Sequence, residues 1–139
     1  MTTKKLIACV LLITGFGLAG CSGNYRLSGK VTFEDGTHAT QGMVVFTTET
    51  FQATGEIRQD GTFVVGSEKA RDGIPKGTYQ VYVTGVGKMT TGGMMGNTLF
   101  VSTVHDKYAA ASTSGLTCTV PAPENKYDLV LEPHPKNYP

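Results

Sequence analysis

The sequence has no tryptophan, only three cysteines and no long apolar run. Its longest apolar stretch, Leu6 to Ile13, is far shorter than the roughly 20 residues that a helix needs to cross a bilayer. Twelve basic residues stand against eleven acidic ones, for a net charge of +1, so the basic surplus is too small to attract nucleic acid. These shortages exclude a multispanning helical membrane protein, a disulfide-stapled scaffold and a nucleic-acid-binding protein.

The start of the chain has the layout of an export signal. A lysine pair precedes the apolar stretch, small residues follow it, and the segment GLAGC ends at Cys21. This order is typical of a secretory signal peptide. The last four residues resemble the lipobox of bacterial lipoproteins, and this resemblance implies cleavage between Gly20 and Cys21 and lipidation of the Cys21 sulfur. We therefore expect a lipoprotein signal peptide over residues 1–20 and a short lipid-anchored tether over residues 21–26.

Lipidation of Cys21 makes the lipid bilayer the first expected partner. One acyl chain, such as a palmitate, anchors a protein only marginally, whereas two or more hold it durably, because each buried methylene contributes about 0.8 kcal/mol. The expected location is the bacterial cell membrane or the outer membrane, on the periplasmic side or exported. Ser22 stands where an Asp would retain some lipoproteins at the inner membrane, which favours the outer membrane wherever that rule operates.

The third cysteine is expected to be structural. Cys9 leaves with the signal peptide and Cys21 is lipidated, so Cys118 has no disulfide partner within the mature chain. In the segment SGLTCTV, Cys118 alternates in phase with Leu116 and Val120, which predicts a buried position on one face of a strand. No histidine stands near it in sequence to act as a base, so we expect no nucleophilic role.

From Tyr25 onward the apolar residues recur with a period of two, and long helix-forming runs are missing. About seven short strands separated by turn residues predict an all-β fold, a single seven-stranded antiparallel β-sandwich over residues 27–133 with a C-terminal tail over 134–139. The predicted inward-facing residues are Tyr25, Leu27, Val31 and Phe33 with a gap at Gly29, then Val44, Phe46, Ala53, Gly55, Ile57, Phe63, Val65, Tyr79, Val81 and Val83.

Asp-Gly pairs mark three turns between the expected strands. In a two-residue hairpin this pair favours a type I′ turn, in which both central residues need positive φ, and we expect that turn at Asp60-Gly61. If Asp35, Asp60 and Asp72 gathered at one end of the sandwich, their oxygens would suit Ca²⁺. Turn formation already accounts for each of them, and no calcium-loop motif completes a site.

Several segments, in their order along the chain, carry a family resemblance: LSGKVTFEDGT, GMVVFTTET, ATGEIRQDGTFVVGS, DGIPKGTYQVYVTG, DKYAAASTSGLTCTV and YDLVLEP. Over residues 27–133 the chain resembles small exported lipoproteins of planctomycete-type bacteria, whose domain is similar to the carboxypeptidase regulatory-like, transthyretin-like β-sandwich. The resemblance implies a structural or binding module with no catalytic residues and no cofactor. One enzyme of transthyretin-like fold, 5-hydroxyisourate hydrolase, ends in Tyr-Arg-Gly-Ser, but this chain ends in PHPKNYP.

The segment from 85 to 100 is rich in glycine and methionine and has no clean periodicity. It is predicted to be a flexible loop between two strands. Its thioethers could contact an apolar partner or soft Cu(I), which leaves open a second function, a ligand-binding protein for a carbohydrate or a metal (Ca or Cu) through loops 85–107. The weak ligand candidates are Met89, Met94, Met95 and His105.

No arrangement of residues indicates catalysis. The histidines are too far apart in sequence for a zinc motif. Ser102 and Ser112 lie near His105-Asp106, but neither serine stands in a nucleophile-elbow motif. We therefore expect a non-catalytic, membrane-anchored lipoprotein of the cell envelope, a structural or interaction module with an envelope protein as its possible partner. The three histidines expected to be solvated are His38, His105 and His134.

Overall fold

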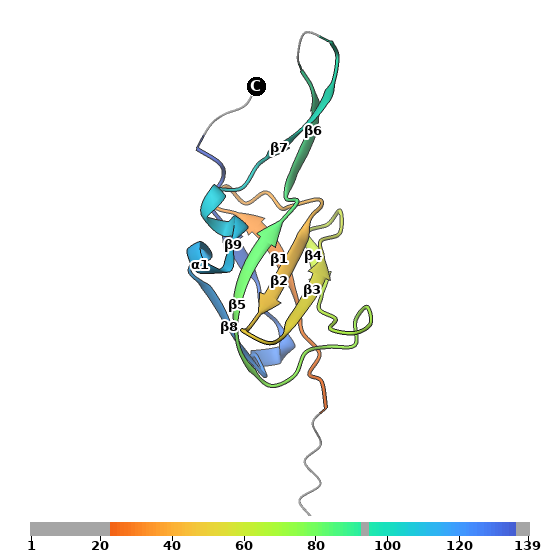
Figure 1. Cartoon of the computed structure of the whole chain (residues 1–139), viewed down its shortest axis with the longest axis vertical. Coiled ribbons are helices and arrows are strands. Elements are labelled where there is room, and N and C mark those ends of the chain that lie inside the picture. Colours follow the sequence, from red (N-terminus) through yellow and green to blue (C-terminus); the bar gives the residue numbers. More distant parts are fainter. Residues whose placement is uncertain (1–22, 93–94, 136–139) are drawn as a thin grey trace, which may run out of the picture.

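The computed structural model describes residues 23–92 and 95–135, and it is predominantly β, as the period-two pattern predicted. Cys21, the signal peptide and Met94 lie outside the described residues. One sheet has the strand order β3 (Gln52–Glu56), β2 (Met43–Thr47), β5 (Gly77–Thr84) and β8 (Leu116–Val120), and the other has the order β4 (Thr62–Val64), β1 (Ser28–Phe33) and β9 (Leu129–Leu131) (Figure 1). A third pair is formed by β6 (Gly87–Thr91) and β7 (Thr98–Ser102), and the short helices are η1 (Asp106–Ala109), α1 (Ala111–Ser114) and η2 (Pro123–Asn125).

Both larger sheets contribute side chains to one hydrophobic core. Phe46 of β2 and Phe63 of β4 have no exposed surface, and their ring centroids lie 6.2 Å apart. Because these strands belong to different sheets, the ring contact joins the two sheets, and burial of each such side chain contributes about 1.5–3 kcal/mol. The predicted inward-facing residues that are buried are Leu27, Val31, Phe33, Val44, Phe46, Ala53, Gly55, Ile57, Phe63, Val65, Tyr79, Val81 and Val83.

Tyr25 departs from this pattern. Its side chain is 37% exposed, so its predicted inward position was wrong. Tyr25 precedes β1 and pairs with Ile74 in an isolated bridge, in which each backbone N–H donates to the carbonyl of the other residue. An isolated bridge lies outside the sheet, so the alternation within β1 does not fix the side to which Tyr25 points.

The pairing of β9 corrects the prediction of an antiparallel sandwich. β9 pairs with β1 in parallel, with Val31 opposite Leu129, whereas the other ladders in the described residues are antiparallel. Antiparallel neighbours can be joined by a tight turn, which fixes their direction. Nearly the whole domain lies between β1 and β9, so no turn constrains them and β9 enters the sheet in the other direction.

The turn at Asp60 also differs from the prediction. Gly61 has φ of +83°, but Asp60 is not among the residues with positive φ, so this is not a type I′ turn. Gly61 N donates to Arg58 O at 2.9 Å, and Arg58 N donates to Thr62 O at 2.9 Å. This is the pattern of a three-residue hairpin loop in which a left-handed glycine follows the turn. The Asp60 carboxylate fixes it by accepting hydrogen bonds from Thr62 N and Oγ1 at 3.0 and 2.6 Å.

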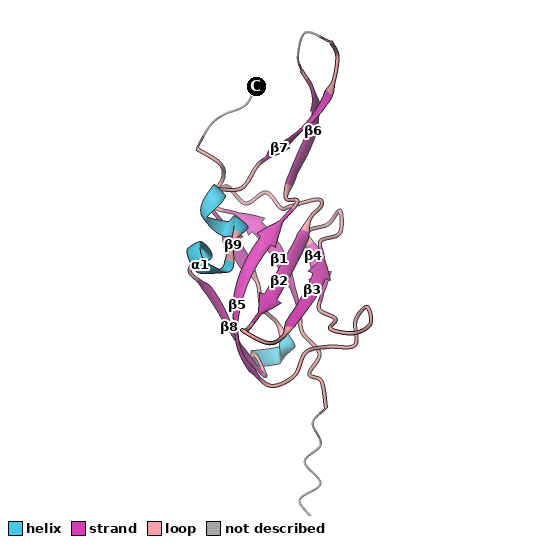
Figure 2. Ribbon diagram, in the orientation of Figure 1, coloured by secondary structure: helices cyan, strands magenta, loops and turns pink. Residues whose placement is uncertain are grey.

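The segment from 85 to 100, predicted to be a flexible loop, instead forms most of an antiparallel hairpin. β6 and β7 pair from Gly87 opposite Ser102 to Thr91 opposite Thr98, and the hairpin extends beyond the larger sheets (Figure 2). Glycine usually weakens a strand, but Gly87 allows the backbone of β6 to approach β7 closely. A Cβ at this position would lie 2.3 Å from the carbonyl oxygen of Val101 and 2.6 Å from the ring of Phe100.

The gap at Gly29 gives a test of the packing of β1. A Cβ there would lie 1.9 Å from the carbonyl oxygen of Tyr127 and 2.8 Å from the ring of Phe63. Gly29→Ala should therefore lower the free energy of unfolding by about 1–3 kcal/mol or more, measured by chemical denaturation. Gly92→Ala is the control, because in the described residues no atom beyond its chain neighbours lies within 4 Å of its Cβ position. Equal stability of the two variants would contradict this packing.

Candidate functional site

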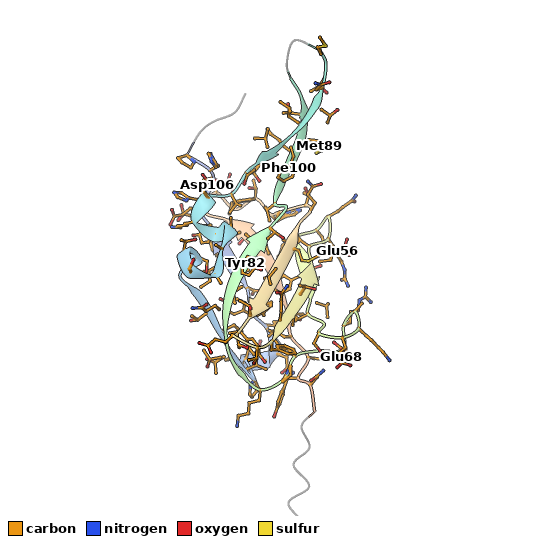
Figure 3. All side chains as sticks on the ribbon, viewed as in Figure 1. Glu56, Glu68, Tyr82, Met89, Phe100 and Asp106 are labelled. Atoms are coloured by element: carbon orange, nitrogen blue, oxygen red, sulfur yellow. The ribbon has the colours of Figure 1, made fainter. Side chains whose placement is uncertain are left out.

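Exposed apolar side chains gather on the β6–β7 hairpin. The hairpin occupies one end of the long axis, and the described chain begins at Gly23 at the opposite end (Figure 1). Met89 is 60% exposed, Leu99 52% and Phe100 48%. Figure 3 shows Met89 and Phe100 on the projecting strands, away from the two larger sheets. This surface, which we call the hairpin surface, consists of residues 87–91 and 98–102.

The hairpin surface has two apolar faces and little charge. Met89 lies opposite Phe100, and Thr90 lies opposite Leu99. Since cross-strand partners point to the same side, Met89 and Phe100 share one face while Leu99 lies on the other. Lys88 is the only charged residue in the two strands, and β7 contains neither charge nor proline. Charges and prolines normally protect a free strand edge, and among the described strands β7 pairs with β6 alone, so its other edge lacks this protection.

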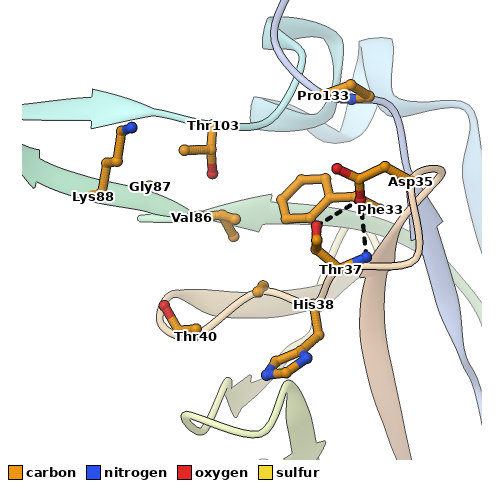
Figure 4. Close-up of a pocket in the computed structure, with 11 residues that line it drawn as sticks. Phe33, Asp35, Thr37, His38, Thr40, Val86, Gly87, Lys88, Thr103 and Pro133 are labelled. Atoms are coloured by element: carbon orange, nitrogen blue, oxygen red, sulfur yellow. Dashed lines mark hydrogen bonds between the residues drawn. The ribbon is translucent and has the colours of Figure 1, made fainter. Parts of the chain in front are cut away.

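A pocket of about 300 Å³ lies where the hairpin leaves the larger sheets (Figure 4). The side chains of Phe33, Ala39 and Val86 are buried and form an apolar floor. Exposed polar side chains, including Asp35 and Lys88, form the rim. A concave apolar floor with a few polar groups around it is typical of small-ligand sites. The lining residues are Phe33, Asp35, Thr37, His38, Ala39, Thr40, Val86, Gly87, Lys88, Thr103 and Pro133.

Asp35 supplies a fixed negative charge at this pocket. Its Oδ1 accepts hydrogen bonds from Thr37 Oγ1 at 2.6 Å and from Thr37 N at 2.9 Å. These bonds hold the pKa of the Asp35 carboxyl below its ordinary value, so the group is ionised at neutral pH. Across the rim, His38 Nε2 lies 3.1 Å from the carbonyl oxygen of Gln59, which orients the imidazole toward the neighbouring turn.

Only part of the segment predicted to bind a ligand lines this pocket. The pocket uses Lys88 and Thr103 from the segment 85–107, but Met89, Met95 and His105 do not line it. Met95 is 88% exposed, and Met94 lies outside the described residues. Asp35 was not predicted to line a pocket, because its role in the turn after β1 already explains its place in the sequence. The pocket forms only where β6 approaches this turn, and the sequence does not show that approach.

The three turn aspartates do not form a cation site. Asp72 accepts backbone N–H groups of Ser67, Glu68 and Lys69 at 2.6, 3.1 and 3.0 Å, and these bonds lower its pKa. The Asp60 carboxylate is likewise used within its own turn. In residues 23–92 and 95–135, no group of three or more His, Cys, Asp or Glu residues is placed to hold a metal ion.

The residues around His105 form local contacts. Its Nδ1 accepts the backbone N–H of Lys107 at 3.1 Å, which caps the short helix η1. Asp106 pairs with His134, with Oδ1 and Nε2 3.3 Å apart, rather than with His105. Ser102 Oγ donates to the carbonyl oxygen of Val104 at 3.1 Å. Each of these groups thus has a structural partner.

Cys118 lies where the sequence predicted. It is 3% exposed and shares the inward face of β8 with Val120 and the half-buried Leu116. Burial raises the pKa of its thiol to about 11, which makes the reactive thiolate scarce at neutral pH. A neighbouring polar residue, Ser114, was not predicted; it is buried and donates from Oγ to the carbonyl oxygen of Val81.

Comparisons with known proteins add no relative: no family model, no curated protein and no solved structure matches this chain. Among the described residues, no helix is both long enough and apolar enough to span a bilayer.

The thiol of Cys118 should make the domain sensitive to alkali. Its pKa rises from 9.0 to about 11 on burial, so over that range the unfolded chain releases a proton that the folded state retains. Stability should therefore be full below about pH 9 and decline as the pH rises toward 11. Melting temperatures measured across this range should fall less steeply for Cys118→Ala. A slope remains in the variant, because burial raises the pKa of Tyr127 to about 12. Identical slopes would contradict the buried thiol.

Proposed function

We propose that this chain is a lipid-anchored, non-catalytic lipoprotein of the cell envelope and acts as an interaction module. In this proposal it is a planctomycete-type exported lipoprotein with one transthyretin-like, carboxypeptidase regulatory-like β-sandwich. Two features support the assignment: the export segment ends at Cys21, and sheets of four and three strands share one core. Seven strands in two packed sheets are the usual architecture of such sandwiches.

The observation that carries the proposal is the placement of the hairpin relative to the start of the described chain. Cys21 lies two residues before Gly23, so a bilayer holding its acyl chains would lie at the Gly23 end. The hairpin surface then faces away from that bilayer (Figure 1). Its exposed Leu99 and Phe100 are thereby offered to a partner in the envelope rather than to the lipid that holds the anchor.

The proposed partner is an envelope protein that contributes an extended segment to the edge of β7. An isolated two-stranded hairpin is only marginally stable in water, so a third strand would stabilise it. Strand addition uses backbone hydrogen bonds for affinity and alternate side chains for specificity. β7 carries no charge that would oppose such pairing, and its partner should offer apolar side chains against Leu99 and Phe100.

Photo-crosslinking in intact envelopes tests this proposal. A photoreactive residue at Leu99 should capture a discrete envelope protein, because Leu99 lies on the hairpin surface. The matched control is Val130, which is 61% exposed but lies on β9 in the smaller sheet. A Leu99→Asp substitution in a chain with the photoreactive residue at Phe100 should remove the crosslink. The same products from Leu99 and Val130, or no product from either, would contradict the proposal.

A second candidate function, ligand binding through segment 85–107, is favoured by the pocket at the foot of the hairpin. Val86, Gly87, Lys88 and Thr103 from this segment line the pocket. The pocket lining contains one carboxylate and one imidazole and no sulfur, a poor donor set for Ca²⁺ or Cu(I). Of the expected ligands, a small polar organic molecule, such as a carbohydrate, therefore fits better than a metal.

A further inference from the structure

The pocket at the foot of the hairpin carries two opposite charges that do not pair. Asp35 lies in the turn that follows β1, and Lys88 lies on β6. Both line the pocket, yet the described residues contain no ion pair between them. In Figure 4, Lys88 projects on one side and Asp35 lies on the other, with Val86 and Phe33 between them. The pocket thus has a cationic end and an anionic end.

Both charged groups remain available to a ligand. Thr37 occupies Oδ1 of Asp35, while no other residue of the described chain donates a hydrogen bond to Oδ2. The Lys88 ammonium likewise has no partner there. Other residues at the pocket are structurally engaged, as His38 is through the carbonyl of Gln59. A carboxylate and an ammonium that are free and held apart can each form a charge-assisted hydrogen bond with a ligand.

The floor between the charges is apolar. Phe33 is 9% exposed, and Ala39 and Val86 are each 3% exposed, so these side chains close the bottom of the pocket. These side chains have little exposed area left to bury, so the gain on binding comes from an apolar ligand group that itself leaves water for this floor. A volume of about 300 Å³ lies at the small end of ligand pockets, which restricts the ligand to a small molecule or the end of a chain.

We propose that this pocket binds a zwitterionic ligand of amino-acid character, a short peptide with free termini and an apolar side chain. The ligand ammonium pairs with Asp35, its carboxylate pairs with Lys88, and its side chain covers Phe33 and Val86. A neutral sugar can hydrogen-bond to both charged groups through its hydroxyls, but it offers neither of them an opposite charge. This inference rests on the second proposed function, ligand binding at the foot of the hairpin, and names its ligand class.

Calorimetry on the lipidated mature chain in nanodiscs tests the inference, with the dipeptide L-alanyl-L-leucine as the probe. N-acetylation removes its positive charge and C-terminal amidation removes its negative charge, and each change should weaken binding about two- to fivefold, because each removes an ion pair with a solvent-exposed group. Lys88→Gln and Asp35→Asn should each cause a similar loss. Lys126→Gln is the control, because this exposed lysine lies outside the pocket.

The pairing of charges is tested by combining probes and variants. Lys88→Gln should weaken binding of the unmodified dipeptide. It should not weaken binding of the amidated dipeptide further, because that probe has no carboxylate to pair with Lys88. Lys88 is an exposed strand residue, so its variant separates ligand contact from any effect of Asp35→Asn on the turn. Circular dichroism of each variant checks that the fold is retained.

Three outcomes would overturn the inference. If glucose binds with a dependence on Lys88 and the dipeptide does not bind, the second proposed function stands and the ligand class is wrong. If the dipeptide binds equally well to both charge variants, it binds outside this pocket. If neither the dipeptide nor glucose gives a binding heat, both the inference and the second proposed function fail.

Discussion

The two larger sheets are held together by the side chains that they bury between them, and Phe46 and Phe63 lie at this contact. The two rings have no exposed surface and belong to strands of different sheets. Tyr127, which precedes β9, adds a further ring contact to Phe46 at 5.8 Å. A core shared in this way holds the turns at both ends of the strands in fixed positions. The foot of the hairpin and the start of the described chain are therefore held apart by a packed body.

Much of this core could be predicted from alternation alone, because a strand with one buried face repeats every two residues. Val81 and Val83 on β5 illustrate this, as does Cys118 on β8. Alternation carries no information on strand direction, so the parallel pairing of β9 with β1 was missed. Alternation also did not predict β6 and β7, because both faces of this hairpin are largely exposed and Gly87 is needed for the close approach of the two backbones.

The candidate site was harder to predict than the fold. Segment 85–100 was singled out for its unusual composition, and its described methionines, Met89 and Met95, are exposed. The two charges at the pocket were not predicted, because Asp35 and Lys88 come from distant parts of the sequence and line one pocket only because β6 passes the turn after β1. Asp35 already had a complete local role in its turn. The sequence therefore indicated the role of Asp35 in the turn but not its place in the pocket.

We propose that a lipid anchor holds the hairpin surface away from the membrane, and the distance of each end of the domain from the bilayer measures this. A single spin label is placed at Met89→Cys or at Glu68→Cys, two positions well separated along the long axis in Figure 3. The relaxation of each label is then measured on the lipidated protein in nanodiscs that contain paramagnetic lipids. The buried Cys118 stays unlabelled because its pKa is raised to about 11. We expect the paramagnetic lipids to enhance the relaxation of the label weakly at position 89 and more strongly at position 68. A stronger effect at position 89, or a chain that does not remain with the nanodisc, would contradict it.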